Sequence, residues 1–208
     1  MEPKDHIENI IEQTFNVIAE VYKTNREGER PYGSNRILFP KTRNSKKRDG
    51  KIRISEQELR FVFVEQLLKY IKDTGWDVYY SVETPTRHAY NGFHDGDPKV
   101  DDKKGQSGNI DLCIHDNQGN RICLIEFKAL NPKEADYQKD FCKLQHEDED
   151  NENILRYFIQ IVENVDSGTM DNIGEKIYVD ERCYDNVTYK CYCLKTGKKC
   201  DITHKQND

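Results

Sequence analysis

The stretch of sequence that decides the fold is NIDLCIH (109–115), followed after a short connection by RICLIEFK (121–128). Both runs are short and rich in β-branched and other apolar residues, which is typical of strands. The connection, DNQGN (116–120), consists of turn-forming residues. The stretch therefore predicts a β-hairpin.

Charged residues interrupt both strands of this hairpin. Asp111 alternates with aliphatic residues in the first strand, so we expect its side chain on the opposite face from theirs. Those aliphatic residues are Ile110, Leu112 and Ile114. In the second strand the apolar run ends in Glu126 and Lys128, which are two residues apart and therefore project from one face. Charges at the end of a buried strand are costly unless a partner or a function uses them.

These side chains have the composition of a metal-assisted hydrolytic site. If the twist of the hairpin brings Asp111 and Glu126 together, their carboxylates repel, and a hard divalent cation such as Mg²⁺ or Mn²⁺ relieves the repulsion. Such a cation polarises a phosphoryl oxygen and lowers the pKa of a bound water. Lys128 would orient that water or stabilise negative charge that develops on phosphorus.

Periodicity in the rest of the chain predicts helices and strands around the hairpin. Helical patterns cover 5–24, 55–75 and 132–147, and strand patterns cover 76–83, 154–165 and parts of the tail beyond 176. The connection 84–108 is expected to be irregular. The order helix, strand, hairpin, helix, strand predicts a single α/β domain over 1–208, with its core in 52–165.

The pattern of Asp111, fourteen residues and then Glu126-Phe127-Lys128 resembles the signature of the PD-(D/E)XK nuclease superfamily. The order of the predicted elements is similar too, although Ile110 stands where that signature has proline. The resemblance implies a restriction endonuclease-like fold, a mixed central sheet flanked by helices, here with an N-terminal helix and a β-rich C-terminal tail. It also implies an enzyme, a Mg²⁺- or Mn²⁺-dependent nuclease that hydrolyses phosphodiester bonds, in DNA rather than RNA.

The same resemblance implies roles for individual residues. Asp111 and Glu126 would bind the metal for catalysis, and Lys128 would position the nucleophilic water. The first core helix often adds an acidic residue to such sites, for which Glu58 is the candidate and Glu56 and Glu65 are the alternatives. Each residue also has a plain structural explanation. Ser55 and Glu58 have the spacing of a helix capping box, Glu126 and Lys128 could form a salt bridge at a strand end, and Asp111 could simply begin a strand.

A basic segment stands out against an acidic chain. The net charge is −6, which argues weakly against a general nucleic-acid binder, but residues 35–53 hold eight Lys and Arg against one Asp. Such a segment localises attraction for phosphate, although a solvated loop is the simpler reading of a charge run. The expected phosphate contacts are Arg36, Lys41, Arg43, Lys46, Lys47 and Arg48.

Other readings of the chain stay open. A non-catalytic module that binds nucleic acid or protein could use the same fold. Cys191, Cys193, Cys200 and His204 could hold zinc, or the cysteines could be small buried strand residues. No apolar run approaches the roughly 20 residues of a membrane span, and seven cysteines without a disulfide rhythm indicate a reducing, cytoplasmic setting. Double-strand cutting would require a homodimer or sequential nicking.

Overall fold

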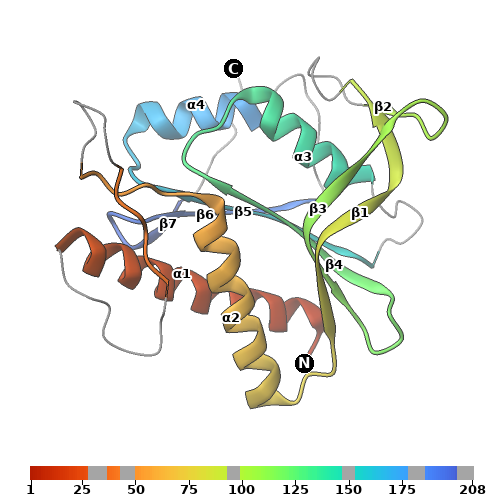
Figure 1. Ribbon diagram of the computed structural model, residues 1–208, viewed down its shortest axis with the longest axis horizontal. Helices are drawn as coiled ribbons and strands as arrows, with labels where there is room; N and C mark the ends of the chain where they lie inside the picture. The colour runs from red at the N-terminus through yellow and green to blue at the C-terminus, as the bar shows by residue number, and fades with distance from the viewer. Residues whose placement is uncertain (28–36, 43–49, 93–98, 147–152, 178–185, 201–208) are drawn as a thin grey trace, which may run out of the picture.

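The computed structural model describes residues 1–27, 37–42, 50–92, 99–146, 153–177 and 186–200. Seven strands form one mixed sheet in the order β2-β1-β3-β4-β5-β6-β7, with helices on both sides (Figure 1). In chain order the elements are α1 (Pro3–Glu27), α2 (Glu56–Thr74), β1 (Tyr79–Asn91), β2 (Lys99–Val100), β3 (Gln106–His115), β4 (Arg121–Ala129), α3 (Glu134–His146), β5 (Leu155–Val162), α4 (Ser167–Ile177), β6 (Thr188–Cys193) and β7 (Lys198–Cys200). The predicted α/β class, with a mixed sheet flanked by helices, is confirmed.

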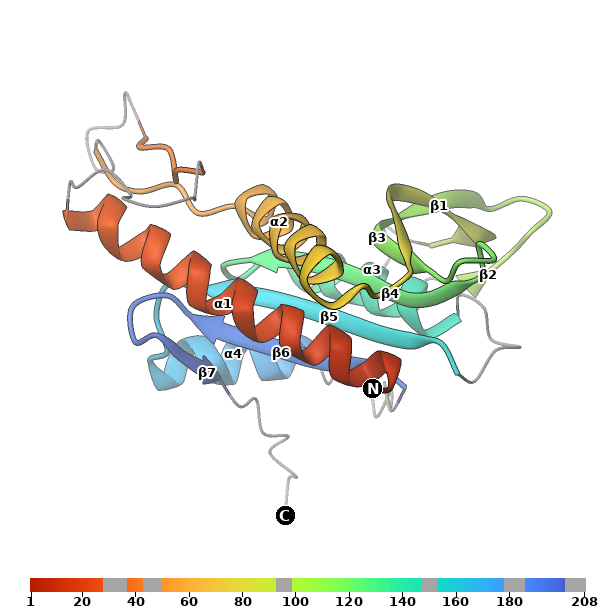
Figure 2. The ribbon, with the colours of Figure 1, turned by 90° about the horizontal axis from the view of Figure 1, so that it is seen from below.

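The two faces of the sheet carry separate apolar clusters. Helices α1 and α2 cover one face and α3 and α4 cover the other, and Figure 2 shows α1 crossing in front of β5 and β6. Alternate residues of each strand supply the two clusters, as in Ile125 and Phe127 toward α2 but Leu124 toward α3. Strand β5 is buried on both faces from Arg156 to Val162, as its sequence predicts for an interior strand.

The strand pairing brings the carboxyl ends of three strands to one edge of the sheet. Strands β1, β3 and β4 pair antiparallel, whereas β4, β5 and β6 run parallel. The carboxyl ends of the three parallel strands therefore lie along the same edge, where Lys128 of β4 is in register with Gln160 of β5. Ligand sites of open α/β sheets commonly lie outside such carboxyl ends.

Most predicted elements are present, with three differences. The long helix 55–75 ends as expected, because Gly75 adopts the left-handed conformation (φ 71°) and its N–H binds the oxygen of Ile71. Strand β1 continues to Asn91, well into the stretch expected to be irregular. Helix α4 was not predicted, and Ile110 packs in the cluster under α3 rather than in one row with Leu112.

Among the described residues, no helix combines the length and apolar character needed to cross a bilayer.

Removing an aromatic ring from the cluster under α3 should test the core. Phe158 is fully buried and stacks on Phe141 with ring centroids 4.4 Å apart. We expect Phe158→Ala to lower the free energy of unfolding by about 3–5 kcal/mol, measured by denaturant titration. The matched control is Phe61→Ala, because Phe61 is 62% exposed and its truncation should cost less than about 0.5 kcal/mol. Equal losses for the two variants would contradict this assignment of the core.

Candidate active site

The strands of the hairpin separate at one point, and the Asp111 carboxylate occupies the gap. The ladder between β3 and β4 ends with the pairing of Leu112 and Ile125. Beyond that pair the main-chain N–H of Phe127 donates to Asp111 Oδ2 at 2.8 Å. An acidic side chain thus replaces the main-chain acceptor that a continued strand would provide, and it remains 19% exposed to solvent.

Glu126 is buried against α3 and paired with a lysine of that helix. Its side chain is 1% exposed, and Lys143 Nζ lies 2.5 Å from Glu126 Oε1. The same ammonium lies 2.9 Å from Asp140 Oδ1 and donates to the main-chain oxygen of Asn109 at 2.8 Å, so all three of its protons have acceptors. Gly108 makes room for this lysine, because a Cβ there would lie 2.9 Å from Lys143 Cδ.

The ion pairs continue from Lys143 through Asp140 to Lys128. Lys128 Nζ lies 2.5 Å from Asp140 Oδ2, and both side chains are largely buried. Burial raises the pKa of Glu126, and the nearby Asp140 charge adds to the effect. Burial alone would lower the pKa of Lys128, but the Asp140 carboxylate outweighs it and holds that pKa above its ordinary value. Lys128 therefore keeps its proton at neutral pH and acts as a fixed positive charge.

A more accessible carboxylate reaches the same place from α2. Glu56 begins this helix, is 43% exposed, and has Oε2 3.7 Å from Lys128 Nζ. Burial is the largest cause of its raised pKa; Lys128 opposes the rise and Asp111 adds to it. Phe63 holds α2 over β4 through an edge-to-face contact with Phe127, with centroids 5.4 Å apart. The packing of α2 thus places here a carboxylate that is accessible to solvent and whose pKa lies above its ordinary value.

Arg60 bridges two acids on the α2 side of the gap. Its Nη1 lies 3.7 Å from Asp111 Oδ1 and also forms an ion pair with Glu83. Glu83 has φ 47°, in the left-handed region that non-glycine residues seldom adopt, at a cost on the order of 1–3 kcal/mol. Such strain persists only where the surroundings fix it, and the surroundings here include the salt bridge to Arg60.

The three acidic candidates from α2 are not equivalent in the structure. Glu58 contacts Arg53 at 3.3 Å and the Ser55 hydroxyl, rather than any residue of the hairpin. The predicted capping box is wrong in its geometry, because Ser55 makes no side-chain bond to the helix backbone. Among the described residues Glu65 forms no ion pair with the hairpin. Of these three acidic residues, Glu56 is therefore the one that contacts the hairpin, and it was the first alternative to Glu58 in the sequence.

The expected phosphate contacts lie mostly outside the described residues. Lys41 is described, and its residue forms an isolated antiparallel bridge with Ile52. The others, Arg36, Arg43, Lys46, Lys47 and Arg48, fall in stretches that the structure does not describe.

The cysteines near the end of the chain occupy strands. Cys191 and Cys193 are buried on β6, and Cys200 lies opposite Cys191 on β7 and is half-buried. This is the arrangement of small strand residues that the sequence allowed for, and His204 lies outside the described residues.

We refer to the charged residues around the hairpin as the acid–lysine cluster. Its members are Glu56, Arg60, Asp111, Glu126, Lys128, Asp140 and Lys143. Four carboxylates face three cations, so the fully ionised cluster has an excess of negative charge. All of its acidic donors are oxygens, which is the ligand type that Mg²⁺ and Mn²⁺ prefer. In kind and charge these donors fit such an ion, although no three acidic, His or Cys side chains of the described residues converge as a ready-made metal site.

The sequence places Asp140 and Lys143 on the helix that follows the hairpin, but it did not assign Lys143 to the site. The signal was present, because Asp140 and Lys143 are three residues apart and lie among Tyr137, Phe141 and Leu144 on the apolar face of α3. An acid and a base on the buried face of a helix need partners inside the protein.

Comparisons with known proteins add no assignment. No protein-family model matches the chain, and searches of curated proteins and of solved structures give no match. The functional argument therefore rests on the acid–lysine cluster and its surroundings.

Removing the charge of Lys143 should expose the cost of burying Glu126. We expect Lys143→Met to lower the free energy of unfolding at neutral pH by about 3–5 kcal/mol, because a carboxylate is left buried without its cation. Burial raises the pKa of Glu126 in the folded state, so the folded variant binds more protons than the unfolded chain and regains stability as the pH falls toward about 5.

The control for this experiment is Lys133→Met, since Lys133 is exposed just before α3. Denaturant titrations of both variants across pH measure the difference between them. A constant difference, or none at neutral pH, would contradict the buried pair.

Proposed function

We propose that the protein is a metal-dependent nuclease of the PD-(D/E)XK type, with a restriction endonuclease-like fold, acting on DNA. The observation that carries the proposal is that Asp111 is bonded to the main chain of Phe127, between Glu126 and Lys128, and that Glu56 reaches Lys128 from the neighbouring helix. The mixed sheet with helices on both faces agrees with that fold. The side chains of Asp111 and Glu56 are 19% and 43% exposed, so the site is in contact with solvent.

The residues present would hold a divalent cation through oxygen ligands. Asp111 and Glu126 would supply carboxylates, and Glu56 would supply a third, more accessible one. When bound, Mg²⁺ or Mn²⁺ would polarise the phosphoryl oxygens and neutralise charge in the transition state. Such an ion would also more than offset the single negative charge by which the carboxylates of the acid–lysine cluster exceed its cations.

The protein's own side chains would manage charge and protons during hydrolysis. A water oxygen attacks phosphorus, a P–O ester bond breaks, and the departing oxygen takes up a proton. Lys128 would stabilise negative charge on the phosphoryl group, since its raised pKa keeps it protonated. Glu56 is suited to accept the proton of the attacking water, because its raised pKa lies closer to neutral pH than the pKa of an ordinary carboxylate.

A non-catalytic binding module remains the second candidate function. Its support is that lysines or arginines already contact the acidic side chains of the cluster. Against it stands the burial of Glu126 and Lys143, which a binding surface does not require. The cleavage experiment separates the two.

Cleavage of labelled circular, linear and single-stranded DNA with Mg²⁺, Mn²⁺ or EDTA tests the nuclease directly. We expect metal-dependent cutting, reduced by roughly 100-fold or more in Asp111→Asn and in Lys128→Ala, because each removes charge that the transition state needs. The matched controls are Asp73→Asn and Lys69→Ala, both exposed near the far end of α2, which should cut like the wild type. If the wild type cuts none of these substrates, the binding module becomes the leading account.

The neighbouring acids of α2 permit a sharper test. We expect Glu56→Gln to lower the cleavage rate by roughly 100-fold and to remove the loss of activity at acidic pH, which in the wild type should begin above the ordinary glutamate pKa. Glu58→Gln should alter thermal stability through Arg53 and Ser55 while leaving the shape of the pH–rate profile unchanged. The opposite result would restore Glu58 to the catalytic site.

A further inference from the structure

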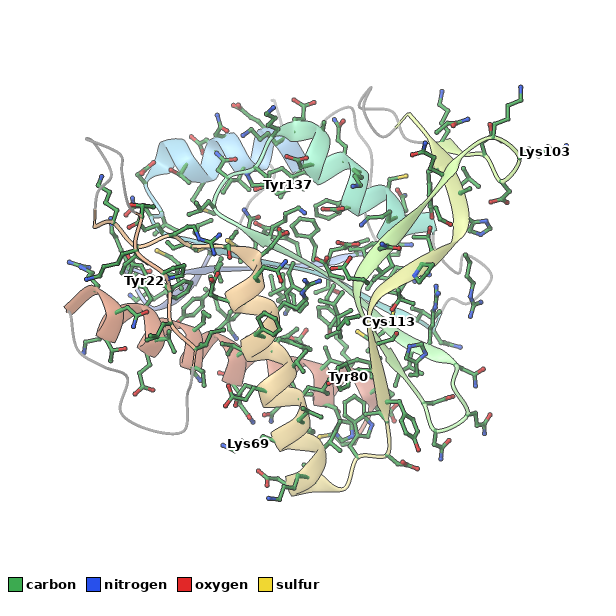
Figure 3. All side chains as sticks on the ribbon, viewed as in Figure 1. Tyr22, Lys69, Tyr80, Lys103, Cys113 and Tyr137 are labelled. Atoms are coloured by element: carbon green, nitrogen blue, oxygen red, sulfur yellow. The ribbon has the colours of Figure 1, made fainter. Side chains whose placement is uncertain are left out.

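A polar cavity lies outside the acid–lysine cluster and shares no residue with it. Its volume is about 490 Å³, and it opens between the end of α1, the bridge around Lys41 and the ends of β5 and β6. Arg26 comes from the last turn of α1, Lys51 from the strand-like segment before α2, and Lys195 from the turn between β6 and β7. Figure 3 labels Tyr22, which lies on this side of the molecule and lines the cavity.

The cavity is strongly basic in a chain that is acidic overall. Among the described residues that line it, four are cationic and one is a carboxylate, whereas the whole chain carries −6. That carboxylate, Glu163, already accepts the Tyr22 hydroxyl at 2.9 Å and lies 3.8 Å from Lys195 Nζ. Burial and the bond to Glu163 raise the Tyr22 pKa to about 12, so the hydroxyl remains a donor. Within the described part of the chain, Arg26, Lys41 and Lys51 form no ion pair.

The shape of the lining indicates which part of a ligand the cavity would recognise. Among the described residues that line it, Tyr22 is the only aromatic one, and it is only 3% exposed, so its ring is not available for stacking on a base. Flexible lysine and arginine side chains bind phosphate without reading sequence. The cavity is therefore suited to the phosphate of a nucleic acid rather than to its bases.

The cavity and the acid–lysine cluster lie along the same edge of the sheet. Lys128 is in register with Gln160 on β5, and Glu163 follows at the end of that strand. The segment from Lys51 to Glu56 runs directly from one site to the other, over at most about 18 Å. At roughly 3.4 Å of rise per nucleotide, this upper limit corresponds to at most about five nucleotides of one strand.

We propose that the cavity lined by Arg26, Lys41, Lys51 and Lys195 is a phosphate subsite that holds a nucleic-acid strand a few nucleotides from the cleaved bond. The inference rests on the proposed nuclease function and adds three residues, Arg26, Lys51 and Lys195, to those expected from the basic segment. The subsite fixes the strand by its backbone, and so contributes affinity and register without sequence preference.

Binding measured in EDTA tests the subsite apart from catalysis. Fluorescence anisotropy would compare labelled oligonucleotides shorter and longer than about five nucleotides, over a series of salt concentrations. We expect the variant with all four cationic residues changed to Gln to lose affinity for the longer strands, and to show a salt dependence of log K weaker by roughly 3. Strands with and without a terminal phosphate identify which phosphate is bound. If the cavity binds a terminal phosphate, the variant would lose affinity only for strands that carry one.

The control removes the same number of charges elsewhere, by changing Lys69, Lys72, Lys103 and Lys104 to Gln. All four are exposed, and Figure 3 shows Lys69 and Lys103 far from Tyr22. Equal salt slopes for the two variants, or no binding of any strand by the wild type, would overturn the subsite. Thermal unfolding of each variant checks that the fold is retained.

Cleavage assays on the same proteins separate this inference from the nuclease proposal. If cleavage is normal and the substitutions in the cavity leave binding unchanged, the subsite alone is overturned. Cavity-dependent binding without any cleavage would overturn the nuclease and leave a phosphate-binding site.

Discussion

The buried ion pair between Glu126 and Lys143 is the contact on which the rest of the site depends. It joins the hairpin to α3, and through Asp140 it positions Lys128 on the same strand. Burying two charges is expensive, and apolar residues of similar size commonly stabilise a fold as well or better. Stability alone is therefore a poor reason for this arrangement. A site that must hold charges in a fixed low-dielectric setting is a better one, since functional sites concentrate such perturbed groups.

The gap between β3 and β4 is the second constraint, and it couples backbone to chemistry. Because Asp111 accepts the Phe127 N–H, its carboxylate is fixed by the sheet itself and requires no support from a flexible loop. The aromatic ring of Phe127 packs on Phe63, so the residue whose main chain orients Asp111 also fixes the position of α2. Glu56 and Arg60 then reach the gap from the first turns of that helix. One short segment of β4 thus sets the positions of acids from three elements.

The sequence predicts much of this fold and part of the site, for physical reasons that differ by element. The hairpin and the shared face of Glu126 and Lys128 follow from alternation, which is local. The extension of β1 does not follow from the local pattern, because Pro85 within it argues against a strand. The proline is tolerated because the edge of β1 away from β3 pairs with β2 only near the end of β1. Helix α4 contains two glycines and depends on tertiary packing of Ile173 and Ile177, which local propensity does not record.

The sequence could not predict which acidic residue of α2 faces the hairpin, because this too depends on tertiary packing. Glu56 and Glu58 both lie in the first turn, and spacing alone cannot say how the helix is rotated about its axis. That rotation is set by the apolar contacts of α2 with α1 and β4, which are long-range. The Arg53 contact then provides Glu58 with a local partner and removes it from the gap.

The distribution of charge along the sheet edge relates the basic cavity to the acid–lysine cluster. A strand of nucleic acid is repelled by an acidic protein except where cations are concentrated, and its phosphates recur at regular intervals. Here the basic cavity and the acid–lysine cluster are joined by a single segment, Lys51 to Glu56, whose two ends carry opposite charge. Phosphate held at the basic end would bring its neighbours past Arg53 toward Lys128, the fixed cation next to Glu56. The acidic centre alone would repel such a polymer, so a chemistry that needs carboxylates at a phosphodiester also needs a cationic site to hold the strand there.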